Sequence, residues 1–265
     1  MKRLTGKIES ILALVIFAGA LAGSSLVANA ASAPAGAQAQ SEKDSASAVQ
    51  SQLSKKQYQN VHVTMNDGIA TLTGTVELYE YKLDAEKKVL HTKGVSAVRN
   101  QIEVAGNDTS DAELQKKLGD KLAYDRVGFG NVFDAITLNV NKGVVTLGGH
   151  THNYVNRDSA LGIVATTSGV KDMVDNIEVD PVSIMDDQTR MAVARAVYGF
   201  TTLNKYAIDP AKPIRISVQN GHVELYGVVN SEADKDAANI QANGVPGVFS
   251  VKNYLQVAGQ PTERP

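Results

Sequence analysis

The sequence predicts an α+β protein made of three tandem small αββαβ domains, each a three-stranded mixed sheet with two helices packed on one face. Three observations predict this fold. Residues 68–104, 143–179 and 221–257 align with one another without a gap. In each copy, apolar and polar residues alternate on both sides of a polar-Gly pair. Stretches with helical apolar spacing come before and after each alternating pair. A repeat at a constant spacing indicates one supersecondary unit copied along the chain.

Nine glycines recur at three places in the repeat, and we predict that they are structural. They are Gly68, Gly143 and Gly221, then Gly74, Gly149 and Gly227, then Gly94, Gly169 and Gly247. The first group is expected in hairpin turns, because Asn and Gly tolerate a positive φ. The second group lies in phase with the inward residues, where a missing side chain would let a helix approach the sheet. The third group is expected to end the second helix as a C-cap.

The remaining elements follow from periodicity. Residues such as Val61, Val63 and Met65 alternate with polar residues before the turn, and this period of two predicts a sheet covered on one side. A second helix is predicted over residues 79–92, 155–167 and 232–242, followed by a short strand over 101–104, 176–179 and 254–257. A first helix is predicted over 44–56, around Leu114, Leu118 and Leu122, and over 188–198.

These elements divide the chain into domains at residues 44–106, 110–180 and 186–258. Residues 31–43 are rich in Ala, Gln and Ser and are predicted to form a flexible linker. Residues 259–265 are predicted to be a disordered tail. Each domain is close to the smallest size that folds alone, so contacts between copies are expected to contribute to stability.

The N-terminal residues 1–30 have the pattern of a signal peptide. Lys2, Arg3 and Lys7 precede an apolar run over residues 11–21, and Ala28-Asn29-Ala30 forms an A-x-A cleavage site. We therefore expect cleavage after Ala30 and a periplasmic location. The alternative is that the apolar run stays attached as an N-terminal anchor.

Charge and composition narrow the function. Removing residues 1–30 takes away three basic residues and one Glu, which changes the formal net charge from −2 to −4. This charge argues against nucleic acid as a partner, because nucleic-acid binders carry a basic excess. The sequence contains no Cys, so thiol chemistry is excluded. It also contains none of the common catalytic or nucleotide-binding motifs, and we predict no enzyme activity, no catalytic residue, no metal and no cofactor.

The pattern resembles the BON domain family. The resemblance is carried by the Asn-Asp-Gly hairpin at residues 66–68, by Leu72-Thr73-Gly74 and its two equivalents, and by the closing Gly-Val…Val run. It implies an αββαβ fold, a place among bacterial periplasmic and outer-membrane proteins, and attachment to phospholipid membranes, as in osmotically induced periplasmic proteins. The resemblance implies no catalytic residue.

One recurring column suggests where a lipid would bind. Lys82, Arg157 and Lys235 occupy equivalent positions near the start of the second helix. Tyr79, Tyr81 and Tyr154 lie beside them in the first two copies. A basic residue beside a Tyr suits the headgroup layer of a bilayer, and these six residues are our candidate lipid-binding residues. The alternative is an ordinary solvated helix face with local ion pairs.

Three other features of the sequence each allow two interpretations. His150 and His152 lie two apart and could share a metal, or they could simply end an exposed strand. Asp186 and Asp187 could accept a cation or could cap the helix that follows, where negative charge meets the helix N-terminus. The longer connections at 125–134 and 201–213 carry Phe133 and Tyr206, which could contact a partner or fold back onto their own domain.

Two functions follow from these observations. The first is a non-enzymatic periplasmic or envelope module that binds phospholipid membrane surfaces, with a role in stress. The alternative is a multivalent protein-interaction or chaperone-like adaptor, in which three modules offer several weak contacts to envelope proteins.

Overall fold

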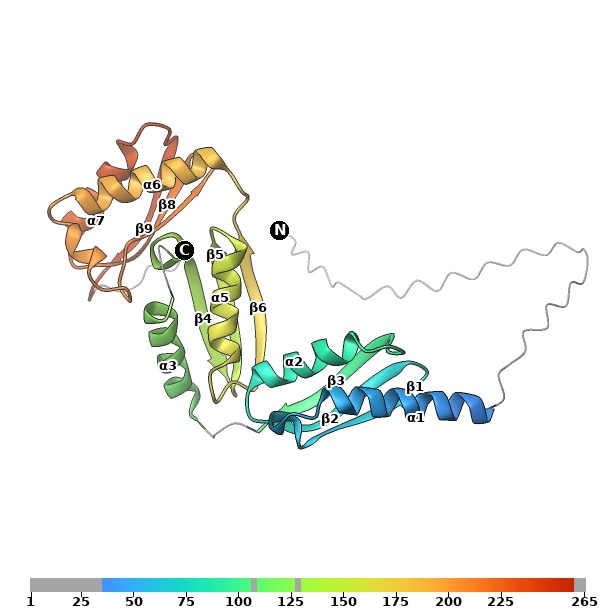
Figure 1. Ribbon diagram of the computed structural model, residues 1–265. Coiled ribbons are helices and arrows are strands. Elements are labelled where there is room, and N and C mark those ends of the chain that lie inside the picture. Colours follow the sequence, from blue (N-terminus) through green and yellow to red (C-terminus); the bar gives the residue numbers. More distant parts are fainter. Residues whose placement is uncertain (1–34, 106–108, 127–129, 260–265) are drawn as a thin grey trace, which may run out of the picture.

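The computed structural model describes residues 35–105, 109–126 and 130–259. The predicted signal peptide and residues 260–265 of the predicted tail lie outside these described residues. Within them the chain forms three small units that follow one another in space (Figure 1). We call these units domain 1, domain 2 and domain 3 in chain order.

Domain 1 shows the element order of the repeat. It contains α1 (Ala35–Gln52), η1 (Lys56–Tyr58), β1 (Val61–Asn66), β2 (Ile69–Val76), α2 (Tyr79–Leu90) and β3 (Ala97–Val104). The central strand β2 pairs antiparallel with β1 and parallel with β3. Both helices pack on one face of this mixed sheet (Figure 1).

Domains 2 and 3 repeat that order. Domain 2 contains α3 (Asp111–Tyr124), α4 (Gly130–Phe133), β4 (Ala135–Asn141), β5 (Val144–Thr151), α5 (Tyr154–Ala165) and β6 (Asp172–Val179). Domain 3 contains α6 (Ile184–Gly199), η2 (Asn204–Ala207), β7 (Arg215–Gln219), β8 (His222–Val229), α7 (Glu232–Asn243) and β9 (Ser250–Val257). Each forms its own three-stranded sheet, with the second strand of the domain in the middle. The predicted fold class is therefore confirmed.

Two boundaries differ from the prediction. Helix α1 begins at Ala35, so most of the predicted flexible linker over 31–43 is helical. Ala and Gln are strong helix formers, and their propensity outweighs the lack of an apolar period. The last strand of each domain begins about four residues earlier than predicted, as at Ala97 rather than residue 101. It pairs with the whole length of the central strand.

The hairpin turns have the predicted conformation. Asp67, Lys142 and Asn220 have φ values of 48°, 52° and 51°, and the following glycines have 76°, 77° and 74°. Two consecutive positive φ values define a type I′ turn, whose twist matches that of the flanking strands. In domains 2 and 3 a helix also holds the turn. Asp111 accepts the backbone amides of Lys142 and Gly143, at 2.7 and 2.9 Å.

The other two groups of glycines are needed for reasons that differ from the prediction. A Cβ on Gly74 or Gly149 would lie 1.9 Å from the carbonyl oxygen of Asn60, the residue before β1, or of Ala135, the first residue of β4, rather than from a helix. The third group does not cap the second helix. The C-cap residues of α2 and α5 are His91 and Thr166, and Gly94 and Gly169 lie in the turn that follows, again with positive φ.

Neighbouring domains pack against each other through shared clusters of buried apolar residues. One buried cluster runs through domain 1 and domain 2, from Val49 to Ile177. A second cluster fills domain 3, and it includes Phe133 from domain 2. The expectation that contacts between copies matter is thus supported by shared apolar burial.

Candidate functional site

The three equivalent basic residues, Lys82, Arg157 and Lys235, do not make the same contacts in the three domains. In domains 1 and 3 the backbone carbonyl of Lys82 or Lys235 accepts a hydrogen bond from an Asn of the last strand, Asn100 or Asn253, at 3.0 and 2.9 Å. In domain 2 the strand carries Asp175 instead, and its carboxylate forms an ion pair with Arg157. Arg157 is therefore committed to an internal partner, whereas no anion among the described residues pairs with the ammonium group of Lys82 or Lys235.

The tyrosines beside this column also differ in exposure. Tyr79 is 7% exposed and contacts Asp172 and Met173 of domain 2, and burial together with Asp172 raises its pKa to about 12. The ring of Tyr81 packs edge-on against that of Tyr58, with centroids 6.4 Å apart. Tyr154 is 65% exposed, next to Val155 at 77%.

Only part of the candidate lipid set is therefore available to a membrane. Tyr79 lies buried between domains 1 and 2, which leaves little of its ring exposed to a membrane, and its role as a lipid contact stays a prediction. Lys82, Lys235, Tyr81, Arg157 and Tyr154 stay predictions, and Tyr154 is the most exposed of the three tyrosines. The sequence could not separate these cases, because burial of Tyr79 depends on a neighbouring domain.

The structure also forms a polar junction between domains 2 and 3 that sequence analysis did not predict. It begins with Phe133, the last residue of α4, which is 5% exposed and packs into the domain 3 core. The long connection over 125–134 therefore contacts a neighbouring domain. Tyr206, in the other long connection, folds back onto its own domain, where its hydroxyl donates to Asp234 at 2.8 Å. Tyr206 thus follows the fold-back alternative, whereas Phe133 packs on a neighbouring domain of the same chain, which neither alternative described.

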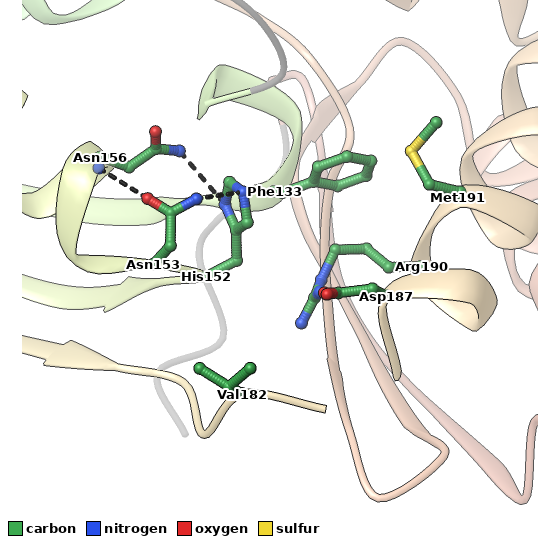
Figure 2. A pocket seen from close by; sticks show the side chains of 8 residues that line it. All are labelled: Phe133, His152, Asn153, Asn156, Val182, Asp187, Arg190 and Met191. Atoms are coloured by element: carbon green, nitrogen blue, oxygen red, sulfur yellow. Dashed lines mark hydrogen bonds and ion pairs between the residues drawn. The ribbon is translucent and has the colours of Figure 1, made fainter. Parts of the chain in front are cut away.

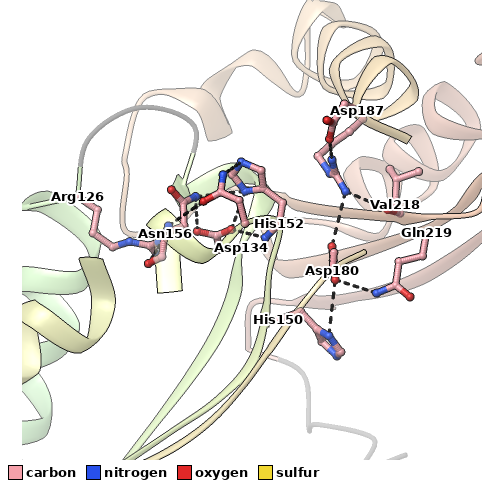
Figure 3. A network of polar contacts seen from close by, with 11 residues as sticks. Arg126, Asp134, His150, His152, Asn156, Asp180, Asp187, Val218 and Gln219 are labelled. Carbon is pink, nitrogen blue, oxygen red and sulfur yellow. Dashed lines mark hydrogen bonds and ion pairs between the residues drawn. The ribbon is translucent and has the colours of Figure 1, made fainter. Parts of the chain in front are cut away.

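Beside the junction, within domain 2, a first polar cluster centres on Asp134, whose carboxylate is fully buried. Asp134 forms an ion pair with Arg126 and lies 2.9 Å from Nδ1 of His152. It also accepts the backbone amide of His152 at 3.0 Å and the side-chain amide of Asn156 at 2.8 Å. Figure 3 shows these groups converging on one carboxylate.

A second cluster, at the junction itself, centres on Asp180, just beyond β6. Its carboxylate accepts the side-chain amide of Gln219 at 2.8 Å and lies 3.6 Å from Nη2 of Arg190, both from domain 3. Nδ1 of His150 lies 3.9 Å away (Figure 3). Burial raises the pKa of Asp180, although Gln219, Arg190 and His150 oppose that rise.

His150 and His152 therefore serve different carboxylates and do not point at a common ion. Among the described residues no group of three or more His, Cys, Asp or Glu side chains could hold a metal. Asp186 accepts the backbone amides of Asn220 and Gly221, both at 2.9 Å, and Asp187 pairs with Arg190. Both aspartates lie in the first turn of α6, where negative charge is favourable, but the residue that caps this helix is Ser183.

A cavity of about 380 Å³ lies beside these clusters, between domain 2 and domain 3. Phe133, Val182 and Met191 form apolar walls, and His152 and Arg190 add polar groups (Figure 2). The hydrogen bonds and ion pairs described above already engage both polar side chains.

Three segments of the chain, residues 41–106, 110–181 and 200–259, match the BON domain. The chain belongs to the BON domain family. The third match begins after α6, although α6 occupies the same place in domain 3 as the first helix does in the other two BON domains.

Two similarities place the chain among known proteins. It is 29% identical over 132 residues to "Osmotically-inducible protein Y" of Escherichia coli (strain K12), an alignment that covers 46% of this chain and 61% of that protein. A structure of CdsD, a structural protein of the type III secretion system of Chlamydia trachomatis, matches with 17% identity over 81% of this chain and 92% of that one. Its TM-score is 0.23.

No helix among the described residues combines the length and apolarity that crossing a bilayer requires.

Proposed function

We propose that this BON protein is exported to the periplasm and binds phospholipid membrane surfaces without catalysing a reaction. The observation that supports this best is the succession of three BON domains over residues 41–259. The partial similarity to a protein named for osmotic induction adds a role under osmotic stress to the proposal. Export follows from the signal-peptide pattern of residues 1–30.

The exposed side chains fit peripheral binding. Tyr154 and Val155 project at the start of α5, and an amphipathic Tyr beside an apolar residue suits the boundary between headgroups and acyl chains. One such pair buries little area, so we expect weak and reversible binding by each domain. Three linked domains then raise the overall affinity, since the later contacts form at high effective concentration.

The test is cosedimentation of the chain from residue 31 to 265 with liposomes. We expect binding at low salt to vesicles that contain phosphatidylglycerol, and weaker binding as salt screens the charges. Tyr154→Ala with Val155→Ala should weaken binding. Tyr79 occupies the equivalent position in domain 1 but is buried, so Tyr79→Ala should change the stability of the protein and not its direct contact with the vesicles. No sedimentation with any vesicle at low salt would remove the membrane function.

A second function, a protein-interaction adaptor, is supported by one exposed segment. Val182, just before α6, and Ile184 and Met185, its first two residues, are 89%, 74% and 73% exposed. Contiguous exposed apolar residues mark contact sites on proteins. This function predicts crosslinks to envelope proteins that are lost when these three residues become Ser, and that survive substitution of Lys82, Arg157 and Lys235.

A further inference from the structure

An open cavity in domain 1 carries a concentration of positive charge. It lies between the end of α1 and the second half of α2, and its volume is about 680 Å³. Lys87, Lys88, His91 and Lys93 line it, together with Gln52 and Asp84. Lys87, His91 and Lys93 are exposed, so the cavity faces solvent.

The charges at this cavity are not balanced locally. The single carboxylate, Asp84, forms an ion pair with Lys88 and accepts the hydroxyl hydrogen of Tyr58. These contacts lower the pKa of Asp84, with a further contribution from Lys55. Lys87 and Lys93 form no ion pair with any other residue in the described part of the chain. Three lysines thus line a cavity whose one carboxylate Lys88 already neutralises, in a chain whose formal net charge is −2.

The repeat shows that the fold does not require these lysines. In the gap-free alignment Lys87, Lys88 and Lys93 correspond to Gly162, Ile163 and Ser168 in domain 2. In domain 3 they correspond to Ile240, Gln241 and Pro246.

Favourable charge at a helix C-terminus is a general reason for lysines in a last turn. Helices α5 and α7 nevertheless end with no basic residue in their last turns. Lys93 lies beyond the end of α2, where that effect is weaker still.

We propose that this cavity is a binding site for the phosphate groups of anionic phospholipids at a membrane surface. Ammonium groups bind phosphate as compact point charges with several donors each, and Lys87 and Lys93 are available to do so. The Nδ1–H group of His91 donates to the carbonyl oxygen of Lys87 at 2.7 Å, which fixes the orientation of this ring at the cavity wall. An open cavity suits a headgroup that stays attached to its bilayer. The proposal rests on the proposed function and assigns the main headgroup contact to domain 1 rather than to the column of Lys82, Arg157 and Lys235.

The test compares two double variants of the chain from residue 31 to 265. Lys87→Gln with Lys93→Gln removes two charges at the cavity. Lys116→Gln with Lys117→Gln removes two exposed charges from α3 in domain 2 and serves as the matched control. Each protein is titrated with vesicles of equal parts phosphatidylcholine and phosphatidylglycerol, with pure phosphatidylcholine vesicles, and with inorganic phosphate at the same phosphate concentration. Circular dichroism confirms that both variants fold.

We expect the cavity variant to bind the anionic vesicles about thirty-fold more weakly than the unaltered chain, and the control variant less than about three-fold more weakly. Inorganic phosphate should not displace the vesicles. Equal losses of vesicle affinity in the two variants, or no loss in either, would show that the cavity is not the binding site. Membrane binding itself would still stand. Displacement of the vesicles by inorganic phosphate would show that free phosphate, rather than a phospholipid, is the ligand of the cavity. Failure of the unaltered chain to bind any vesicle would remove the proposed function and this site together.

Discussion

The guanidinium of Arg190, on the first helix of domain 3, lies 3.6 Å from the carboxylate of Asp180, at the end of domain 2. Both side chains are almost fully buried. Arg190 also donates to the carbonyl oxygen of Val218 at 3.0 Å and pairs with Asp187. A buried ion pair across a domain boundary makes the relative position of the two domains depend on a specific contact, because either charge alone is costly to bury.

Breaking this pair from one side should destabilise domains 2 and 3. Arg190→Ala leaves Asp180 buried without its cation, and we expect the free energy of unfolding to fall by about 3–5 kcal/mol. Asp180→Asn combined with Arg190→Met removes both charges and should recover most of that loss. Urea unfolding at neutral pH measures both effects. A single variant as stable as the parent would show that the pair contributes nothing to the junction.

Phe133 should couple the stability of domain 2 to that of domain 3. Its ring is buried against the domain 3 core, so Phe133→Ala leaves a cavity there and should cost about 3–5 kcal/mol. We also expect the unfolding of domains 2 and 3 to separate into two transitions in calorimetry. Phe249→Ala is the control, because Phe249 is 77% exposed and should change stability by less than about 1 kcal/mol. A single unchanged transition in the Phe133 variant would contradict the coupling.

The fold was largely predictable because its determinants are local and occur three times. Apolar and polar residues alternate on both sides of Asp67-Gly68 and its equivalents, which indicates a hairpin in each copy. One copy alone would be a weak signal, but the same pattern in three copies is a strong one. Prediction failed where two local properties of the sequence, apolar periodicity and helix propensity, favour different structures. The Ala- and Gln-rich stretch before Asp44 has no apolar period but high helix propensity, and the structure shows a helix from Ala35.

The sites were much less predictable. Arg126, Asp134 and His152 are brought together by the path of a loop, and Asp180 meets Arg190 only because two domains dock. Neither arrangement leaves a spacing pattern in the sequence. The one available signal was the extra length of the connection over 125–134, which pointed to function or contact without naming its partner. The basic cavity is different, since Lys87, Lys88 and Lys93 are neighbours in sequence and comparison of the three copies would have shown them.

Two glycines of domain 2 should respond oppositely to the same substitution. A Cβ on Gly149 would lie 1.9 Å from the carbonyl oxygen of Ala135, and the φ of Gly149 is 86°. Gly149→Ala should therefore cost more than about 2 kcal/mol. Gly162 lies inside α5 with no atom within 4 Å of its Cβ position, so Gly162→Ala should stabilise the protein by about 0.5–1 kcal/mol. Thermal melting of the two variants gives both signs, and two shifts in the same direction would contradict this reading of the repeat's second glycine.

Asp186 should make the stability of domain 3 fall in acid. Burial alone would raise its pKa, but the amides of Gly221 and Asn220 and the hydroxyl of Ser183 outweigh burial and lower the pKa below its ordinary value of 3.8. A carboxyl whose pKa is lower in the folded state contributes stability above its unfolded pKa and loses it as pH falls through the folded pKa. Asp186→Asn should therefore cost about 2 kcal/mol at neutral pH and progressively less below about pH 4.

The measurement for Asp186 is the difference in urea unfolding free energy between variant and parent at several pH values, since other carboxyls titrate equally in both proteins. Asp236→Asn, on the exposed side of α7, is the control and should show a small difference that does not change with pH. A pH-independent cost for Asp186→Asn would mean that the neutral side chain holds the hairpin turn as well as the carboxylate does. In that case the turn would be held by the geometry of the acceptor rather than by its charge.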